Sequence, residues 1–261
     1  MWSKATLRLI RSLDSRKGRR VTGLFVAEGP KLVGELAGAM ECEYLLFAAT
    51  WAAANGDVRA ALSRACAATG EDCVADADFA RASLLQTPQG VLALFRQPAH
   101  DAHPAQAMAT GLHLALDGVQ DPGNLGTIVR LADWFGVHDI WCSPLTADVW
   151  NPKAVQASMG GLARVRVHYI DLYAALGQLP TAVASYATAL DGQPLWQAPL
   201  TAAGVVVMGN EGRGVTPDVA RVCSHRLLIP SFPAGAPTTE SLNVGVATAI
   251  VLAEFRRRLM S

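Results

Sequence analysis

The chain has 261 residues, of which 51% are hydrophobic and 17% charged, and its 22 basic and 22 acidic side chains give a formal net charge of zero. This much apolar material predicts a folded protein with a sizeable core rather than a disordered one, and the length fits one large domain or two modest ones. A zero net charge also argues against a uniformly basic nucleic-acid-binding protein.

The sequence shows no segment typical of export or of membrane insertion. The N-terminal stretch is charged from Lys4 onward, unlike a signal peptide, and no run approaches the ~18 apolar residues that a membrane helix needs. The five cysteines are odd in number and have neither CxxC nor Cys/His metal spacing. We therefore expect reduced thiols, no metal and a cytoplasmic protein.

The first hundred residues predict a small α/β domain with a basic N-terminal arm. Residues 1–31 carry a net charge of +6, so the remaining chain carries −6. Apolar periodicity, with Gly and Pro as punctuation, indicates helices at 3–14, 30–39 and 57–70 and strands at 23–29, 43–48 and 91–95. Residues 97–110 contain two prolines and little periodicity, which is typical of a linker. We place the domains at 1–98 and 111–261, with the linker at 99–110.

The second half alternates strands with helices. We expect helices at 122–136 and about 241–259, and strands at 112–118, 139–142, 164–170, 181–187, 204–209 and 226–230. This alternation predicts an α/β domain with a mostly parallel sheet, in which ligands bind beyond the carboxyl ends of the strands. Three loops in that position are rich in Gly and polar residues, at 117–126, 208–214 and 230–243.

Each of these loops carries residues suited to binding. Asn124 stands at the start of a helix whose second turn carries Arg130, and Glu211 is the acid of a turn with three glycines. Ser241 or Asn243 could cap the last helix. Taken singly, the first segment fits an ordinary capped helix as well as a binding site, and the second and third fit an ordinary turn or helix cap better. The sequence lacks the glycine-rich dinucleotide fingerprint, the P-loop and the G-x-S-x-G elbow.

Taken together and in this order, the three segments resemble the signature motifs of the SpoU (TrmH-type) branch of the SPOUT RNA methyltransferases. The first, N-x-G-x-x-x-R, is matched by Asn124, Gly126 and Arg130, and the second, G-x-E-x-x-G, by Gly209, Glu211 and Gly214. The third, I-P followed by S-L-N-V, is matched by Ile229, Pro230, Ser241, Leu242, Asn243 and Val244. Ser231 stands where the family often has Met, and the loop from Pro230 to Ser241 is longer than usual.

The resemblance covers about 112–258 and implies a parallel-sheet domain tied in a trefoil knot, a homodimer and S-adenosylmethionine as the cofactor. The segment before it is similar to the L30e-like domain that binds the RNA substrate in this family. By resemblance, Met208, Gly209, Ile229 and Leu242 contact the cofactor, mainly through backbone groups, and no metal is needed.

The implied reaction is methyl transfer to a ribose 2′-hydroxyl of RNA, with ribosomal RNA favoured over transfer RNA. Arg130 is the expected activator. Because a guanidinium stays protonated, we expect it to hold the adjacent phosphate and to stabilise charge on the 2′-oxygen. Asn124, Glu211, Ser241 and Asn243 would orient Arg130, the ribose and the loops.

The basic arm is a candidate RNA contact, through Arg16, Lys17, Arg19 and Arg20. A solvated arm that makes no contact is the alternative for these residues. For the whole chain, two other functions stay open: an RNA-binding protein that keeps the fold but has lost catalysis, and a nucleotide-dependent oxidoreductase. The intact motif residues disfavour the first, and the missing glycine fingerprint disfavours the second.

Overall fold

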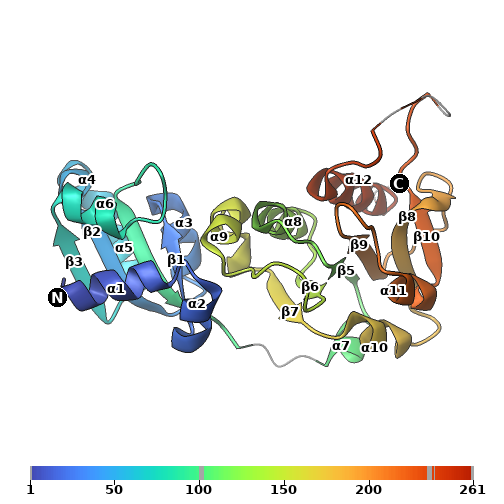
Figure 1. Cartoon of the computed structure of the whole chain (residues 1–261), viewed down its shortest axis with the longest axis horizontal. Coiled ribbons are helices and arrows are strands. Elements are labelled where there is room, and N and C mark those ends of the chain that lie inside the picture. Colours follow the sequence, from blue (N-terminus) through green and yellow to red (C-terminus); the bar gives the residue numbers. More distant parts are fainter. Residues whose placement is uncertain (1, 100–102, 234–236, 238, 260–261) are drawn as a thin grey trace. The chain divides into compact units, whose positions relative to one another are not determined.

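The computed structural model of the chain describes residues 2–99, 103–233, 237 and 239–259 (Figure 1). The chain forms two compact units. The first comprises residues 1–99 together with 148–164, and the second comprises residues 100–147 and 165–261. The first unit thus includes a segment from the middle of the sequence. Within the predicted linker, residues 100–102 lie outside the described residues.

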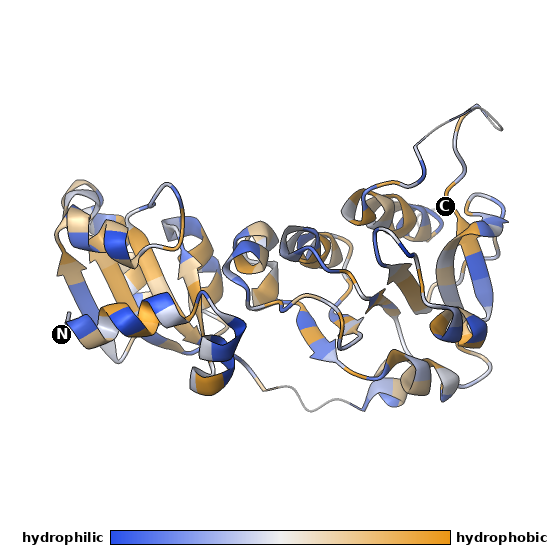
Figure 2. Cartoon of the chain, viewed as in Figure 1, coloured by the Kyte–Doolittle hydropathy of each residue, from blue (hydrophilic) through white to orange (hydrophobic). Residues whose placement is uncertain are grey.

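The first unit is built around a four-stranded sheet. Its elements are α1 (Lys4–Ser12), α2 (Arg16–Thr22), β1 (Leu24–Glu28), α3 (Pro30–Ala37), β2 (Cys42–Ala48), α4 (Ala49–Ala54), α5 (Gly56–Cys66), β3 (Gly70–Val74), α6 (Asp76–Ala82), β4 (Val91–Arg96), α9 (Pro152–Ser158) and the 3-10 helix η1 (Gly161–Ala163). The strand order is β1-β4-β2-β3, with β4 antiparallel to both of its neighbours and β3 parallel to β2. Nearly all residues of β1, β2 and β4 are buried, and most of them are apolar, as the orange colouring of these strands in Figure 2 shows.

The helix predicted at 3–14 is present as α1, and a second short helix that was not predicted, α2, follows it. α1 ends at Ser12, and α2 begins after Ser15, whose hydroxyl accepts the backbone N–H of Gly18 at 3.0 Å. A Cβ at Gly18 would overlap the carbonyl group of Ser12, so the close approach of the two helices requires glycine there.

The side chain of Arg19 is buried against the segment that connects these helices, with only 2% of its surface exposed. Its guanidinium forms an ion pair with Asp148 at 2.7 Å and donates hydrogen bonds to the carbonyl oxygens of Leu13 and Asp14 at 2.7 and 2.8 Å. Arg19 is therefore a structural residue, which corrects the prediction that it contacts RNA. The other three predicted contacts on this stretch are exposed, namely Arg16, Lys17 and Arg20.

The first unit also buries a carboxylate. Glu28, the last residue of β1, is 3% exposed and accepts hydrogen bonds from the Ser83 hydroxyl at 2.5 Å and the Leu84 N–H at 2.6 Å. Burial raises the pKa of Glu28, and these hydrogen bonds offset that effect only in part.

The second unit contains a six-stranded sheet in which every pairing is parallel. Its elements are α7 (Pro104–Ala107), β5 (Leu112–Asp117), α8 (Pro122–Trp134), β6 (Asp139–Cys142), β7 (Arg166–Tyr169), α10 (Leu172–Gly177), β8 (Ser185–Pro194), β9 (Gly204–Gly209), α11 (Pro217–Val222), β10 (His225–Leu228) and α12 (Val244–Arg257). The predicted parallel-sheet domain is confirmed, and the trefoil knot stays a prediction.

The strand order β10-β8-β9-β5-β6-β7 places a topological switch point at β5. From β5 the chain continues to β6 and β7 on one side of the sheet, whereas β8, β9 and β10 lie on the other side. Crevices outside the carboxyl ends of strands at such a point are the usual ligand sites of parallel sheets. The loops that follow β5 and β9 leave the sheet at this point.

A polar cluster around the buried Asp139 lies at the start of β6. The Asp139 carboxylate is bound in a bidentate fashion by Arg166, with both distances 2.7 Å, and lies 2.8 Å from Nε2 of His168. Burial by itself would raise the pKa of Asp139, but the hydrogen bonds from His168 and Arg166 outweigh it and hold this pKa well below its usual range. His168 also stacks on the fully buried Trp141, which fixes the cluster against the core.

The structure differs from the predicted elements mainly where polar residues form regular structure. β3 alternates exposed and half-buried residues and buries only Val74, so no apolar run in the sequence predicts this strand. The helix expected at 57–70 ends at Cys66 because Ala67 adopts a left-handed conformation, and Gly70 begins β3 instead. No helix within the described ranges is long and apolar enough to cross a membrane.

Candidate active site at the carboxyl edge of the parallel sheet

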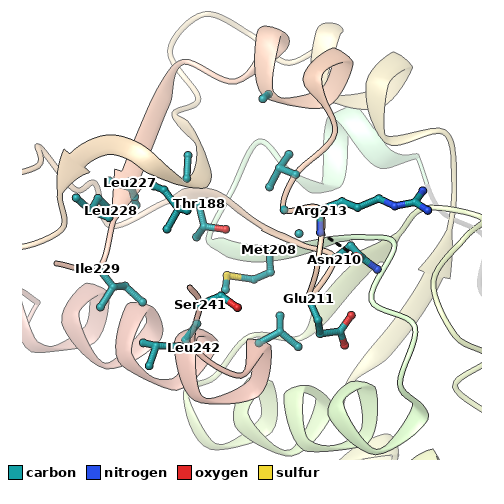
Figure 3. A pocket seen from close by; sticks show the side chains of 18 of the residues that line it. Thr188, Met208, Asn210, Glu211, Arg213, Leu227, Leu228, Ile229, Ser241 and Leu242 are labelled. Atoms are coloured by element: carbon teal, nitrogen blue, oxygen red, sulfur yellow. Dashed lines mark hydrogen bonds between the residues drawn. The ribbon is translucent and has the colours of Figure 1, made fainter. Parts of the chain in front are cut away.

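The loops that carry the second and third motifs line one cavity of about 470 Å³ in the second unit, whereas the loop of the first motif contributes none of its lining residues (Figure 3). Its walls come from the excursion inside β8, from the turn after β9, from the end of β10 and from the segment before α12. The main lining segments are residues 188–191, 208–215, 226–229 and 240–242. A volume of this size is typical of a pocket for a small molecule.

All four residues predicted to contact the cofactor line this cavity. Met208 is buried at the end of β9 and points into the cavity, while Ile229 and Leu242 lie on the side of β10 and α12 (Figure 3). Gly209 follows Met208, and a Cβ there would overlap the backbone of Gly214 and Val215. The tight turn after β9 therefore requires glycine at this position.

Three of the predicted catalytic residues form one hydrogen-bonded chain. The side-chain amide of Asn124 donates to Oε1 of Glu211 at 3.0 Å, and the amide of Asn243 donates to Oδ1 of Asn124 at 3.0 Å. These residues come from the three separate motifs. Glu211 also lines the cavity, so this chain of hydrogen bonds, which we call the motif cluster, ends at the cavity wall.

Each asparagine is held in place by a helix terminus. Asn124 is the third residue of α8, and its backbone N–H donates to the capping carboxylate of Asp121 at 2.8 Å. Asn243 caps α12, because its Oδ1 accepts the N–H groups of Gly245 and Val246 at 2.9 and 3.3 Å. The capping role and the link to Asn124 use different atoms of the Asn243 amide, so one side chain serves both.

The remaining two predicted catalytic residues lie outside the motif cluster. Ser241 is exposed and lines the cavity next to Leu242. Arg130 lies on the exposed side of α8, nearly two turns after Asn124, and is not among the residues that line the cavity. The structure thus brings Asn124, Glu211, Ser241 and Asn243 to one edge of the sheet, with Arg130 further along α8.

The turn after β9 is fixed by Asn210, which occupies a variable position of the second motif. Its amide donates to the carbonyl oxygen of Gly118 at 2.8 Å, and its Oδ1 accepts the N–H groups of Gly212 and Arg213 at 3.0 and 3.1 Å. An Asn directly after a strand and before a glycine-rich turn is a recognisable signal for such an arrangement.

Two other features of the site escape the sequence analysis. The buried Asp117 accepts the N–H and the hydroxyl of Thr216 at 2.8 and 2.7 Å, which ties the end of β5 to the segment before α11. Inside β8, residues 188–192 leave the register with β10, and 188–191 of them line the cavity; no local sequence pattern marks this excursion. Among the described residues, no group of three or more His, Cys, Asp or Glu side chains could hold a metal ion.

Comparison with known proteins agrees with this geometry. Residues 111–253 match the sequence model of the SpoU rRNA Methylase family, which is more than half of the chain. The chain belongs to the SpoU rRNA methylase family. Residues 4–93 match a second model, the MRM3-like substrate binding domain, which confirms the predicted N-terminal substrate-binding domain.

Related structures and sequences extend over nearly the whole chain. A TrmH-family structure from Porphyromonas gingivalis is 40% identical, with a TM-score of 0.83 and 99% of each chain covered. The rRNA methyltransferase of Sinorhizobium meliloti, solved with AdoMet bound, is 28% identical over all of this chain and 97% of that one, with a TM-score of 0.83. The 23S rRNA (guanosine(2553)-2′-O)-methyltransferase RlmP of Bacillus subtilis is 29% identical over 248 residues, 94% of each protein.

Membership of the SpoU family confirms the predicted activity. The chain is an RNA methyltransferase that depends on S-adenosylmethionine, and the catalytically inactive alternative and the oxidoreductase are set aside.

Proposed function

We propose that this SpoU-family enzyme methylates a ribose 2′-hydroxyl of ribosomal RNA. The observation that carries the proposal is the motif cluster, because Asn124, Glu211 and Asn243 join three loops beside one cavity. The similarity to RlmP, whose name specifies a 2′-O-methyltransferase of 23S rRNA, supports the ribose position and the class of RNA.

The cavity fits S-adenosylmethionine in size and in the character of its walls. Met208, Ile229 and Leu242 offer apolar surface for an adenine ring, and the tight turn that begins at Gly209 leaves backbone groups accessible. Carboxylates on the cavity wall, Glu211 among them, suit a cationic ligand. When bound, S-adenosylmethionine supplies a methyl group activated by a sulfonium.

The side chains of the site orient the acceptor hydroxyl. In the proposed mechanism, the motif cluster fixes the relative positions of the three loops, so that the ribose meets a preorganised surface. Ser241 contributes a hydroxyl at the cavity edge. A guanidinium stays protonated in proteins, so Arg130 acts as a donor and a positive charge: it holds the neighbouring phosphate and stabilises negative charge on the 2′-oxygen.

The RNA contact of the N-terminal unit is proposed for Arg16, Lys17 and Arg20. All three side chains are exposed on α2, and cations on one short helix suit a phosphate backbone. Arg19 is left out because its guanidinium is buried and paired. A ribosomal RNA substrate also favours the cytoplasm as the place of action.

We further propose a homodimer formed through α8 and α12. These helices contact one another along the sheet, and their outer surface exposes Trp134 by 82% and Val246 by 51%. The proposal follows the homodimer that the family resemblance implies, and a second chain packed over α8 would cover the exposed Trp134. Arg130 lies on the exposed side of α8 as well. Light scattering on Trp134→Glu would show whether the dimer still forms, and methyl-transfer assays on the same variant would show whether activity falls with it.

The direct test is a map of 2′-O-methyl groups in the RNA of cells with and without the gene. We expect one ribosomal position to lose its methyl group and to regain it when the purified protein and S-adenosylmethionine are added. Loss of a position in transfer RNA would contradict only the class of RNA, whereas an unchanged map would contradict the proposed function.

The assigned role of Arg130 has its own test. Arg130→Ala and Arg130→Lys should each lower methyl transfer by about a hundredfold or more, because Lys cannot reproduce the planar guanidinium. Cofactor affinity, measured by calorimetry, should stay unchanged. A near-normal rate in either variant would rule out this assignment.

A further inference from the structure

The turn after β9 presents a cation at the edge of the cavity. Arg213 lines the cavity, and its backbone N–H is held by the side chain of Asn210. Backbone hydrogen bonds in both directions between Asn210 and Gly214, at 3.0 and 2.9 Å, close the turn around it. The base of the Arg213 side chain is therefore fixed by a rigid turn, while the side chain itself is exposed.

The charge of Arg213 is not used by the fold. Within the described ranges, its guanidinium makes no hydrogen bond or ion pair. The other arginine of the cavity wall, Arg226, is paired with Asp191 at 2.7 Å. Arg213 is thus the uncommitted cation among the described residues of this wall.

The position of Arg213 indicates which anion it can bind. Figure 3 shows its side chain extending away from Met208, on the side of the turn where Asn210 and Glu211 lie. Met208 belongs to the part of the cavity assigned to the cofactor, and Glu211 to the motif cluster assigned to the ribose. The wall also carries Glu211 and Glu240, whose negative charges disfavour an approaching polyanion unless a cation offsets them.

We propose that Arg213 binds a backbone phosphate of the RNA next to the nucleotide that is methylated. This inference rests on the proposed function, because it takes RNA as the substrate of this cavity. A guanidinium can grip a phosphate with two parallel N–H bonds, and such contacts fix the register of a nucleic acid without reading its sequence. Arg213 is then a substrate-positioning contact in addition to Arg130.

The test compares Arg213→Ala and Arg213→Lys with the wild-type enzyme. The probe is an unmodified transcript of large-subunit ribosomal RNA, with affinity measured at several salt concentrations, together with methyl-transfer kinetics and calorimetry with S-adenosylmethionine. We expect Arg213→Ala to weaken RNA binding about tenfold at moderate salt. The slope of log affinity against log salt should fall by about 0.7–0.9, as for one lost phosphate contact. Arg213→Lys should keep the wild-type salt slope, and the affinity for S-adenosylmethionine should not change in either variant.

Arg221→Ala serves as the matched control. Arg221 is an exposed arginine of α11 that pairs with Asp218 and does not line the cavity, so its loss should leave the salt slope unchanged. If Arg213→Ala has the RNA affinity and the salt slope of the wild-type enzyme, the proposal is wrong. It is also wrong if only the cofactor affinity falls, because Arg213 would then bind an anionic group of the cofactor. If the wild-type enzyme neither binds nor methylates any RNA, the proposed function fails as well, and this outcome is distinct from the other two.

Discussion

Two polar clusters in this chain join residues that are far apart in sequence, and they differ in how much water reaches them. The cluster around Arg19 is buried, with the arginine 2% exposed and its guanidinium shared between Asp148 and two carbonyl oxygens. In the motif cluster, Asn124 and Glu211 are half-buried and Asn243 is exposed. The first is closed to any ligand, whereas the second is open on the side of the cavity.

This difference separates residues that hold the fold from residues that are available for binding. A buried ion pair that loses one partner leaves an uncompensated charge, so its removal is costly for stability. A half-exposed amide can exchange its partner for water at little cost, so its removal mainly affects what it positions. Substitutions in the two clusters should therefore affect different measurements.

The largest effect is expected for Arg19→Ala. Removal of the guanidinium leaves Asp148 without its partner and should lower the free energy of unfolding by about 3–5 kcal/mol. Urea unfolding of the full chain would measure this loss. Arg20→Ala, an exposed neighbour on α2, should change stability by no more than about 0.5 kcal/mol. If the two substitutions lower the free energy of unfolding equally, the buried ion pair contributes no more to stability than an exposed arginine.

Asn124→Ala should act on catalysis instead. It breaks the links to Glu211 and Asn243, and we expect methyl transfer to fall by about 10–100-fold, with a stability change below about 1 kcal/mol. Glu211→Gln is the companion variant, because a glutamine can still accept from Asn124 and removes only the charge. If Asn124→Ala is so destabilised that its unfolded fraction explains the whole loss of rate, Asn124 is a structural residue like Arg19.

The cluster at Asp139 extends the comparison to a buried charge within the catalytic unit. Because the pKa of Asp139 is depressed in the folded state, its stabilising contribution is fully present above the usual carboxyl range, begins to fall within that range and continues to fall as the pH drops toward the depressed pKa. Asp139→Asn should therefore destabilise the protein by about 2 kcal/mol at neutral pH, with allowance for the half-exposed Arg166. Unfolding curves at pH 7 and pH 3 test this, and a difference that does not shrink in acid would contradict it.

The smallest effect is expected at Glu28, where burial acts in the opposite direction. Its raised pKa means that the folded state binds a proton more tightly than the unfolded chain, so its contribution to stability falls as the pH rises above about 4.3, the usual value for a glutamate. Glu28→Gln should remove this pH dependence and change stability by less than about 1 kcal/mol at neutral pH. Comparison of urea midpoints at pH 5 and pH 8 would detect it, and an unaltered pH profile would be evidence against it.

Local patterns predict the elements of this chain better than its long-range contacts. The buried strands of the parallel sheet follow from apolar runs, and the three loops that carry the motifs follow from glycine and polar residues at strand ends. Arg19 could not be assigned correctly, because Asp148, its partner, lies 129 residues further along the chain. The motifs identify Asn124 and Asn243, but only the fold shows that these side chains, 119 residues apart, bond to one another.

The segment 148–164 has a consequence for any attempt to recombine this enzyme. It falls inside the region that matches the methylase family, yet its residues pack as part of the first unit. In a chimaera that joins a foreign N-terminal domain at a single junction near residue 110, the positions of Arg19 and Asp148 would come from different parent proteins. The two units are therefore not interchangeable modules, and a successful exchange has to carry 148–164 along with residues 1–99.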